Sequence, residues 1–227
     1  MNIHKIQISI LGGVFCVLAI WGGISKTRYT DIRTETNYLM TLEVPEISEE
    51  MAKETCKIME EELPKSPLIL VVTPVDEIEF VFWAGRQKVI VEDIKKENET
   101  SNINSPNIGS EIWIVNPSWY LRMWDKERQY VNLCGVNTMV KDGHYLVFLD
   151  DVIQGVDGIE PAYKLAGETV ISPVFSLEEK SNVIVEHGEY MIVPYASLCG
   201  NEFFGESEAA NHSWSKLKSK MMDLYVQ

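Results

Sequence analysis

The feature that most constrains this chain is an uncharged stretch of 19 residues, Ile6–Ile24, close to its N-terminus. An apolar helix of this length just crosses a hydrocarbon core of about 30 Å. We therefore expect residues 6–24 to form one transmembrane helix and residues 1–25 to act as a signal anchor. A second interpretation is a cleaved signal peptide, because Gly23-Ile24-Ser25 fits a small-x-small cleavage site. Cleavage there would release a secreted protein.

The charges beside this segment give opposing indications of its orientation. Lys26, Arg28 and Arg33 outnumber Lys5 and the α-amino group, which by the positive-inside rule keeps the following domain in the cytoplasm. The N-terminal flank is only five residues long, however, and short charged flanks usually stay inside the cell. We expect a single-pass protein of the cell membrane whose remaining domain is extracytoplasmic.

The charge of the chain excludes one common class of partner. The formal net charge is −14, and all 34 Asp and Glu residues come after residue 25. Such a domain repels phosphate backbones, so we expect no nucleic-acid partner. The composition, 45% hydrophobic and 24% charged, is typical of a globular protein with a substantial core.

Two amphipathic helices are expected to flank the rest of the chain. Residues 26–47 are polar and indicate a juxtamembrane linker; Ser48 then caps a helix that ends at Pro64. The predicted apolar stripe of this helix is Met51, Thr55, Met59 and Leu63. A second helix is expected after Ser207. Its predicted apolar face is Trp214, Leu217, Met221 and Leu224.

Between these helices the pattern is that of β-strands. The β-branched and aromatic runs are LILVVT (68–73), IEFVFW (78–83), KVIVEDI (88–94), EIWIV (111–115) and YLVFL (145–149). Asn116-Pro117 indicates a turn that ends the fourth run, and His187-Gly188 indicates a hairpin between Val183–Glu186 and Glu189–Val193. Strands that are apolar on both faces suit a closed barrel. We therefore expect residues 48–227 to form a mainly β (α+β) domain, a barrel flanked by the two helices.

The order of these runs resembles a known family. LILVVT precedes KVIVEDI, then IGSEIWIV (108–115), then KDGHYLVFL (141–149). This order is similar to that of the netrin module and the tissue inhibitors of metalloproteinases, and of bacterial extracytoplasmic proteins that look similar. The resemblance covers about residues 66–165 and implies an OB-like barrel. The inhibitors act through a free N-terminal cysteine. No Cys begins the module here, so that activity is not expected.

The four cysteines, Cys16, Cys56, Cys134 and Cys199, include no CxxC pair, so the sequence holds no zinc or redox motif of that kind. Cys134 and Cys199 both lie in a Leu-Cys-Gly sequence. They are candidates for a disulfide if the domain is exported. The alternative is two buried thiols.

Motifs that indicate catalysis are lacking in the sequence. There is no phosphate loop, dinucleotide glycine fingerprint or nucleophile elbow, so we expect no cofactor and name no catalytic residue or metal ligand. The alternative function is a metal-dependent hydrolase that uses the acidic loop near residues 150–160 together with His144. The acidic residues of that loop are Asp150, Asp151, Asp157 and Glu160, and their spacing does not match a calcium-binding loop.

The segment Trp119-Tyr120-Leu121-Arg122-Met123-Trp124 is the most distinctive aromatic cluster. If exposed, Trp119, Tyr120 and Trp124 would form a contact patch for a partner. If buried, they would cover the open end of the barrel. We expect a binding or assembly module without catalysis, whose partner is a protein or another envelope component. A further alternative is a structural component of a membrane complex, packed through Gly12, Gly13, Gly22 and Gly23 of the anchor.

Overall fold

The structure is a computed structural model, and the part of the chain that it describes begins at residue 41. The described residues are 41–81, 83–98, 103–124, 127–155, 158–167, 170–185, 192–194, 198 and 200–226. The expected transmembrane segment, residues 6–24, lies outside them and stays a prediction. Within the described part, every helix is too short or too polar to cross a membrane.

The described domain is mainly β, with two helices, as the sequence predicts. The strands are β1 (Thr41–Glu43), β2 (Leu68–Pro74), β3 (Glu79–Val81), β4 (Ala84–Glu97), β5 (Glu111–Trp124), β6 (Glu127–Asn132), β7 (Tyr145–Ile153), β8 (Ala162–Leu165), β9 (Val174–Ser176), β10 (Ser181–Ile184), β11 (Ile192–Pro194) and β12 (Asn201–Gly205). The helices are α2 (Glu49–Glu62) and α3 (Glu208–Tyr225), and a 3-10 turn, η2 (Leu63–Lys65), follows α2.

Five of the strands pair in a ring. β2 is antiparallel to both β4 and β7, β4 is antiparallel to β5, and β7 is antiparallel to β8. The ring closes through a parallel pairing of β5 with β8, in which Trp113 lies opposite Ala162. Residues Leu68–Val72 of β2 are all buried. The continuous apolar run of this strand is explained by burial on both of its faces.

The remaining strands extend this sheet or lie beside it. β3 pairs with β4, β9 with β7, and β6 with β5, while β1 lies between β6 and β11. β10 pairs with β12 in a separate sheet. The described residues of β10 and β11 therefore belong to different sheets, where the sequence predicts a hairpin between them. The predicted turn, His187-Gly188, lies outside the described residues.

The segment before α2 belongs to the folded domain, although the sequence predicts a polar linker over residues 26–47. Thr41–Glu43 form β1, and Val44 and Ile47 are both about 1% exposed within the core. The apolar residues of this short segment are too few and too irregularly spaced to reveal a strand. Its pairing partners, β6 and β11, lie far away in the sequence.

The helix α2 begins where the sequence predicts, because the side chain of Ser48 accepts a hydrogen bond from Met51 N. Its buried residues are Ala52, Thr55, Cys56 and Met59. Met51, expected on the apolar stripe, is 37% exposed. The buried face is therefore rotated from the predicted one, with Ala52 buried in place of Met51.

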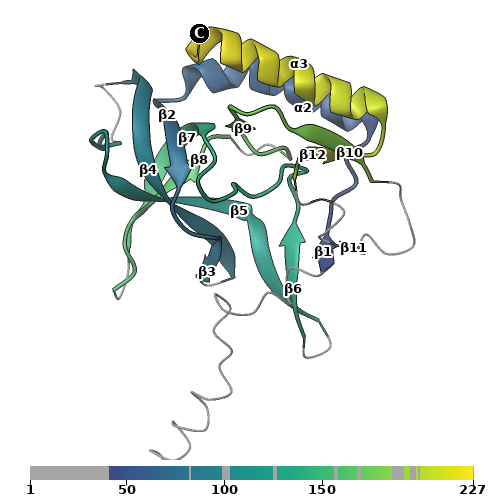
Figure 1. The fold of residues 1–227 in the computed structure, drawn as a ribbon, viewed down its shortest axis with the longest axis horizontal. Helices are drawn as coiled ribbons and strands as arrows, with labels where there is room; N and C mark the ends of the chain where they lie inside the picture. The colour runs from purple at the N-terminus through teal and green to yellow at the C-terminus, as the bar shows by residue number, and fades with distance from the viewer. Residues whose placement is uncertain are drawn as a thin grey trace, which may run out of the picture. The chain divides into compact units, whose positions relative to one another are not determined.

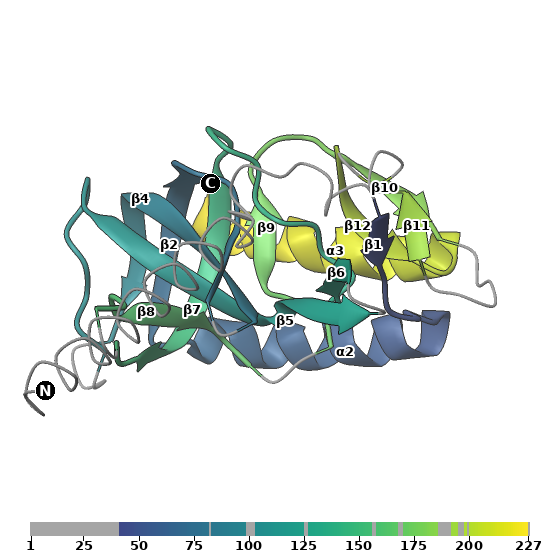
Figure 2. The same ribbon diagram turned by 90° about the horizontal axis from the view of Figure 1, so that it is seen from below.

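The helix α3 lies beside α2 on one side of the sheet (Figures 1 and 2). Ser207 caps it through Ala210 N, and Trp214 stacks between Phe175 of β9 and Phe203 of β12. Leu224, expected on the buried face, is 54% exposed. The final turn of the helix instead contacts the sheet through Tyr225, whose ring meets Phe148 edge-on.

Candidate functional site

The strand β5 continues through Pro117, where the sequence predicts that it ends. Gly85 of β4 lies opposite Asn116, but the preceding residue, Ala84, lies opposite Tyr120. The residues between Asn116 and Tyr120 therefore bulge out of the pairing with β4. Proline has no N–H to donate, and a bulge is one of the few places where a sheet tolerates it.

The aromatic residues predicted as a contact patch occupy different environments. Trp119 is completely buried, and its indole Nε1 donates to Val136 O at 3.4 Å. Tyr120 is half-buried, and the side chain of Trp124 lies outside the described residues. The ring of Trp119 thus belongs to the core of the domain. A contact role for Tyr120 and Trp124 stays a prediction.

A different aromatic residue, Trp83, is exposed at this end of the sheet. It lies in the turn between β3 and β4, where Val81 pairs with Ala84. Its φ of 75° lies in the left-handed region, and its side chain is 55% exposed. Sequence analysis missed Trp83 because it placed the residue at the end of a strand. No turn signal marks Trp83 in the sequence, since Gly or Asn is the usual residue in a two-residue turn.

The structure does not bring His144 to the acidic loop. His144 precedes β7, whereas Asp150 lies six residues further along that strand, about 20 Å away at 3.3 Å per residue. Asp150 instead accepts from Gly167 N and faces Lys164 at 3.9 Å, and Glu160 accepts from the indole of Trp113 at 2.6 Å.

The remaining acidic residues of that loop do not complete a metal-binding cluster within the described part of the chain. Asp151 accepts from Val152 N, and Asp157 lies outside the described residues. Across the described ranges, no three His, Cys, Asp or Glu residues converge in a way that could hold a metal ion.

The cysteines within the described part are free and buried. Cys134 donates to Asn132 Oδ1 at 3.0 Å and to Val136 O at 3.4 Å, and burial raises the pKa of its thiol. Burial likewise raises the pKa of Cys56 to about 12. Cys199 lies outside the described residues, so its pairing with Cys134 stays a prediction.

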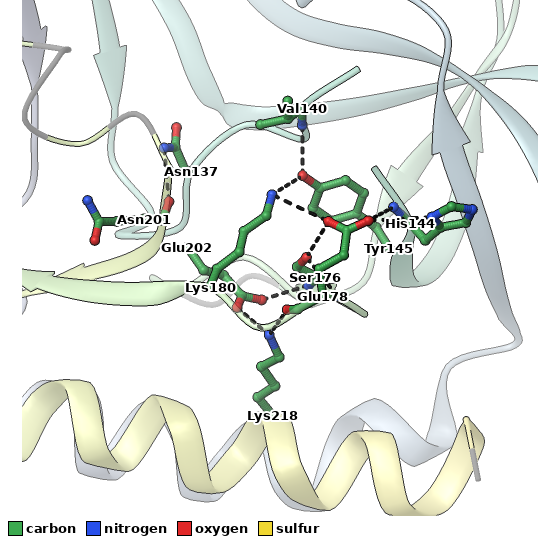
Figure 3. Close-up of polar contacts among 10 residues, drawn as sticks. All are labelled: Asn137, Val140, His144, Tyr145, Ser176, Glu178, Lys180, Asn201, Glu202 and Lys218. Atoms are coloured by element: carbon green, nitrogen blue, oxygen red, sulfur yellow. Dashed lines mark hydrogen bonds and ion pairs between the residues drawn. The ribbon is translucent and has the colours of Figure 1, made fainter. Parts of the chain in front are cut away.

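The largest polar network lies between the sheet and α3 (Figure 3). Tyr145, at the start of β7, is 3% exposed. Its hydroxyl oxygen accepts from Val140 N at 2.8 Å and from Lys180 Nζ at 2.7 Å. The ammonium group of Lys180 also lies over the ring of Tyr145, 4.9 Å from its centroid. Lys180 is thereby held at the edge of the sheet beside β10.

The carboxylate of Glu202, on β12, is the most deeply buried acid of this network, with 5% of the residue exposed. It accepts from Ser176 N at 2.6 Å and pairs with Lys218 of α3. Desolvation raises the pKa of Glu202 above its ordinary value, and the ammonium group of Lys218 opposes this shift only in part. Buried acidic residues with a shifted pKa and a charged partner are common at functional sites.

Glu178 links the two lysines to His144. It accepts from the backbone N–H of His144 at 3.1 Å, lies 3.4 Å from the imidazole Nδ1, and is 4.0 Å from Lys180. Its backbone oxygen accepts from Lys218 at 3.3 Å. Burial alone would raise the pKa of Glu178, but the hydrogen bonds from His144, together with the charge of Lys180 and a hydrogen bond from Ser176, outweigh it, and the pKa falls below its ordinary value.

A surface cavity of about 660 Å³ opens beside this network. Its lining residues are Glu179, Lys180, Ser181, Asn182, Glu202, Trp214, Ser215, Lys218, Ser219 and Met222. Trp214 is fully buried, and among the described residues its indole Nε1 finds no hydrogen-bond acceptor. A buried donor without a partner is costly, which points to a ligand or water at this position.

Of this network, sequence analysis named only His144 as a functional candidate, and it paired His144 with a different acidic segment. The residues of the network come from five places in the chain: β7, β10, β12, α3 and the segment that follows β9. No two of its charged residues form a recognisable motif. The only signal was the uneven placement of lysines on the last helix, which is equally typical of a solvated face. Comparison of the chain with known protein families and with curated proteins finds no match.

Proposed function

We propose that this chain is a membrane-anchored, extracytoplasmic binding module, built on an OB-like barrel, whose ligand is a neutral, hydroxyl-rich molecule of the cell envelope. The observation that carries the proposal is the cavity beneath α3, with its desolvated Glu202 and the unpartnered indole N–H of Trp214. The residues 6–24 supply the anchor.

The ring of strand pairings supports an OB-like barrel. An OB-fold is a five-stranded barrel, and here five strands pair in a ring that closes through β5 and β8. These strands run from Leu68 to Leu165, which is the span of the resemblance to the netrin module. Within this ring, β7 pairs with β9 and packs against α3 through Phe148 and Tyr225.

The charges of the cavity favour a neutral ligand. Two acidic residues, Glu179 and Glu202, balance two basic residues, Lys180 and Lys218. An anion or a cation would therefore meet as much repulsion as attraction. The other polar groups are three serine hydroxyls and the amide of Asn182. Ser181, Ser215 and Asn182 already bond within the domain, but each serine oxygen keeps a lone pair that can accept from a ligand.

Such a mixture of donors and acceptors matches sugar hydroxyls, which do both. Phe175 and Phe203 stack on the Trp214 ring, so a sugar cannot stack there, and Trp214 meets the cavity only as a buried residue of its wall. A short envelope glycan, held by hydrogen bonds more than by stacking, is the ligand class that fits.

The experiment is a titration of the full chain in lipid nanodiscs with tetra-N-acetylchitotetraose and with maltotetraose, followed by calorimetry and by NMR of the Trp214 indole N–H. We expect at least one of the two to bind with a Kd on the order of 1 mM or tighter, and to shift the indole resonance. No heat and no shift with either sugar would contradict the ligand class.

A matched pair of variants tests the location. Ser219→Phe fills the cavity from an exposed position on α3, and should abolish sugar binding. His212→Phe places the same side chain at an exposed position of the same helix that does not line the cavity, and should leave binding unchanged. Equal binding by the two variants would rule out this cavity as the site.

A further inference from the structure

We propose that the end of the sheet formed by Trp83 and the β5–β6 hairpin rests on the membrane, with the indole of Trp83 in the lipid headgroup region. This inference rests on the proposed membrane anchor, and it adds an orientation of the domain. The surface concerned, called here the hairpin end, consists of Trp83 together with residues 120–124 and 127–130.

The first argument is the state of Trp83 itself. A bulky residue in the left-handed region costs of order 1 kcal/mol or more, because its Cβ crowds the backbone. The turn nevertheless holds a tryptophan there and leaves it 55% exposed to water. An unfavourable backbone conformation that exposes a large aromatic side chain indicates that the exposed side chain has a use.

The second argument is the place where the chain enters the domain. Leu42 of β1 pairs with Tyr130, Tyr130 pairs with Leu121, and Leu121 N donates to Trp83 O at 2.9 Å. Leu42 and Trp83 therefore lie in one row across the sheet. They are three strand spacings, or about 14 Å, apart.

The direction of the strands extends this argument. β1 runs parallel to β6, so its first residue, Thr41, points back toward the β5–β6 turn. That turn, where Trp124 pairs with Glu127, reaches three residues beyond the row, or about 10 Å further. The chain thus joins the domain at the hairpin end, after only 16 residues that follow the predicted membrane segment. The helices α2 and α3 lie on the other side of the domain (Figure 1).

The chemistry of the hairpin end favours a lipid surface over a protein partner. Indole rings concentrate at the membrane interface, since they combine an apolar ring with a polar N–H. In a chain of net charge −14, the sequence of the hairpin end has two basic residues, Arg122 and Arg128, and one acidic residue, Glu127. Basic residues close to a membrane are attracted to anionic headgroups.

This orientation has a consequence for the proposed ligand site. With the hairpin end on the bilayer, the helix α3, whose residues line the cavity, lies on the side of the domain away from the lipid (Figure 1). The cavity would then be open to ligands of the surrounding envelope.

The test uses tryptophan fluorescence of the full chain in vesicles of phosphatidylcholine and phosphatidylglycerol, with and without bromine atoms near the headgroup end of the acyl chains. Bromine quenches only indoles close to it. The chain has six tryptophans, and Trp21 lies within the predicted membrane segment. All variants therefore also carry Trp21→Phe, and Trp124→Phe as well, because Trp124 belongs to the hairpin end itself. We expect quenching in this background, and we expect Trp83→Phe to remove most of it.

Trp113→Phe is the matched control. Trp113 lies on the β4–β5 face, where the guanidinium of Arg86 covers its ring at 3.9 Å. Its replacement should leave the quenched fraction unchanged. Quenching that is absent, or that Trp83→Phe does not reduce, would overturn the inference even if the chain stays with the vesicles. If instead the chain separates from the vesicles on flotation, the proposed anchor itself fails.

Discussion

At the scale of single residues, the polar network beneath α3 contains acidic residues whose pKa values are raised by burial and lowered by pairing. Glu202 and Glu178 both contact Lys218, one through its carboxylate and the other through its backbone oxygen. Yet the pKa of Glu202 is raised by desolvation, whereas the hydrogen bonds from His144 lower the pKa of Glu178. Their contributions to stability therefore depend on pH in different windows.

The first prediction concerns Glu202. Because its folded pKa lies above the ordinary 4.5, the folded state keeps this proton to a higher pH than the unfolded state does. The free energy of unfolding therefore falls as the pH rises from about 4.5 through the folded pKa. Denaturant titrations across this range should show the decline in the parent chain. The decline should be absent in Glu202→Gln.

Glu179→Gln provides the matched control, since Glu179 lines the same cavity but is exposed. It should keep the pH dependence of the parent chain. The contribution of Glu178 has the opposite sign and lies below pH 4.5, where its lowered pKa makes stability fall as the pH falls. A decline above pH 4.5 that persists in Glu202→Gln would show that another group is responsible.

The second prediction concerns Gly85, where β4 meets the bulge of β5. A Cβ at this position would lie 2.6 Å from Ile78 Cδ1, and 2.9 Å from both the Cβ and the backbone oxygen of Trp119. Gly85→Ala should therefore lower the free energy of unfolding by about 1–3 kcal/mol, as overpacking usually does. It should also change the near-UV circular dichroism, because Trp119 has to move.

Gly109→Ala separates crowding from backbone strain. A Cβ at Gly109 has open space, but the residue has a φ of 80°. This variant should lose about 1 kcal/mol through its backbone alone. The near-UV spectrum should not change. If Gly85→Ala leaves both the free energy of unfolding and the near-UV spectrum unaltered, then β4 does not pack as closely against Trp119 as the structure shows.

At the scale of elements, each helix depends on a serine at its first turn. Ser207 accepts from Ala210 N at 3.1 Å, and Ser48 makes the equivalent bond in α2. We predict that Ser207→Ala destabilises the domain by about 1 kcal/mol, the usual effect of losing a cap. Ser219→Ala, in the same helix but exposed, should change stability by less than about 0.5 kcal/mol. Equal effects in denaturant unfolding would refute the cap.

The elements that sequence analysis predicted are those fixed by local patterns. Ser48 and Ser207 mark helix starts because a cap acts within four residues. LILVVT predicts β2 because both faces of the strand are buried. The continuation of β5 past Pro117 could not be predicted, since it depends on a bulge set by Gly85 of another strand.

Contacts with distant parts of the chain also explain why the predicted helix faces and the predicted linker were wrong. Met51 and Leu224 fit an apolar stripe by spacing alone, but contact with the sheet decides which residues are buried. β1 is a strand only because β6 and β11 flank it. The candidate site was missed for this reason too, since Tyr145, Lys180, Glu202 and Lys218 meet only in the folded domain.

At the scale of the whole molecule, the domain presents two different surfaces. The helices α2 and α3, the second of which lines the cavity, lie on one side, and the strand β6 with the end of β5 lies on the other (Figure 1). In the proposed account the membrane segment, the hairpin end and the cavity follow one another outward from the bilayer. This order has a function only if the domain lies outside the cytoplasm.

The most direct test of an extracytoplasmic domain is to determine on which side of the membrane α2 lies. Glu54 is exposed on α2, so Glu54→Cys, in a chain that also carries Cys16→Ser and Cys199→Ser, supplies one accessible thiol. Cys56 and Cys134 are buried, and the same chain without Glu54→Cys serves as the control. The account predicts that a membrane-impermeant maleimide labels this cysteine in intact cells. Labelling that appears only after lysis would contradict it.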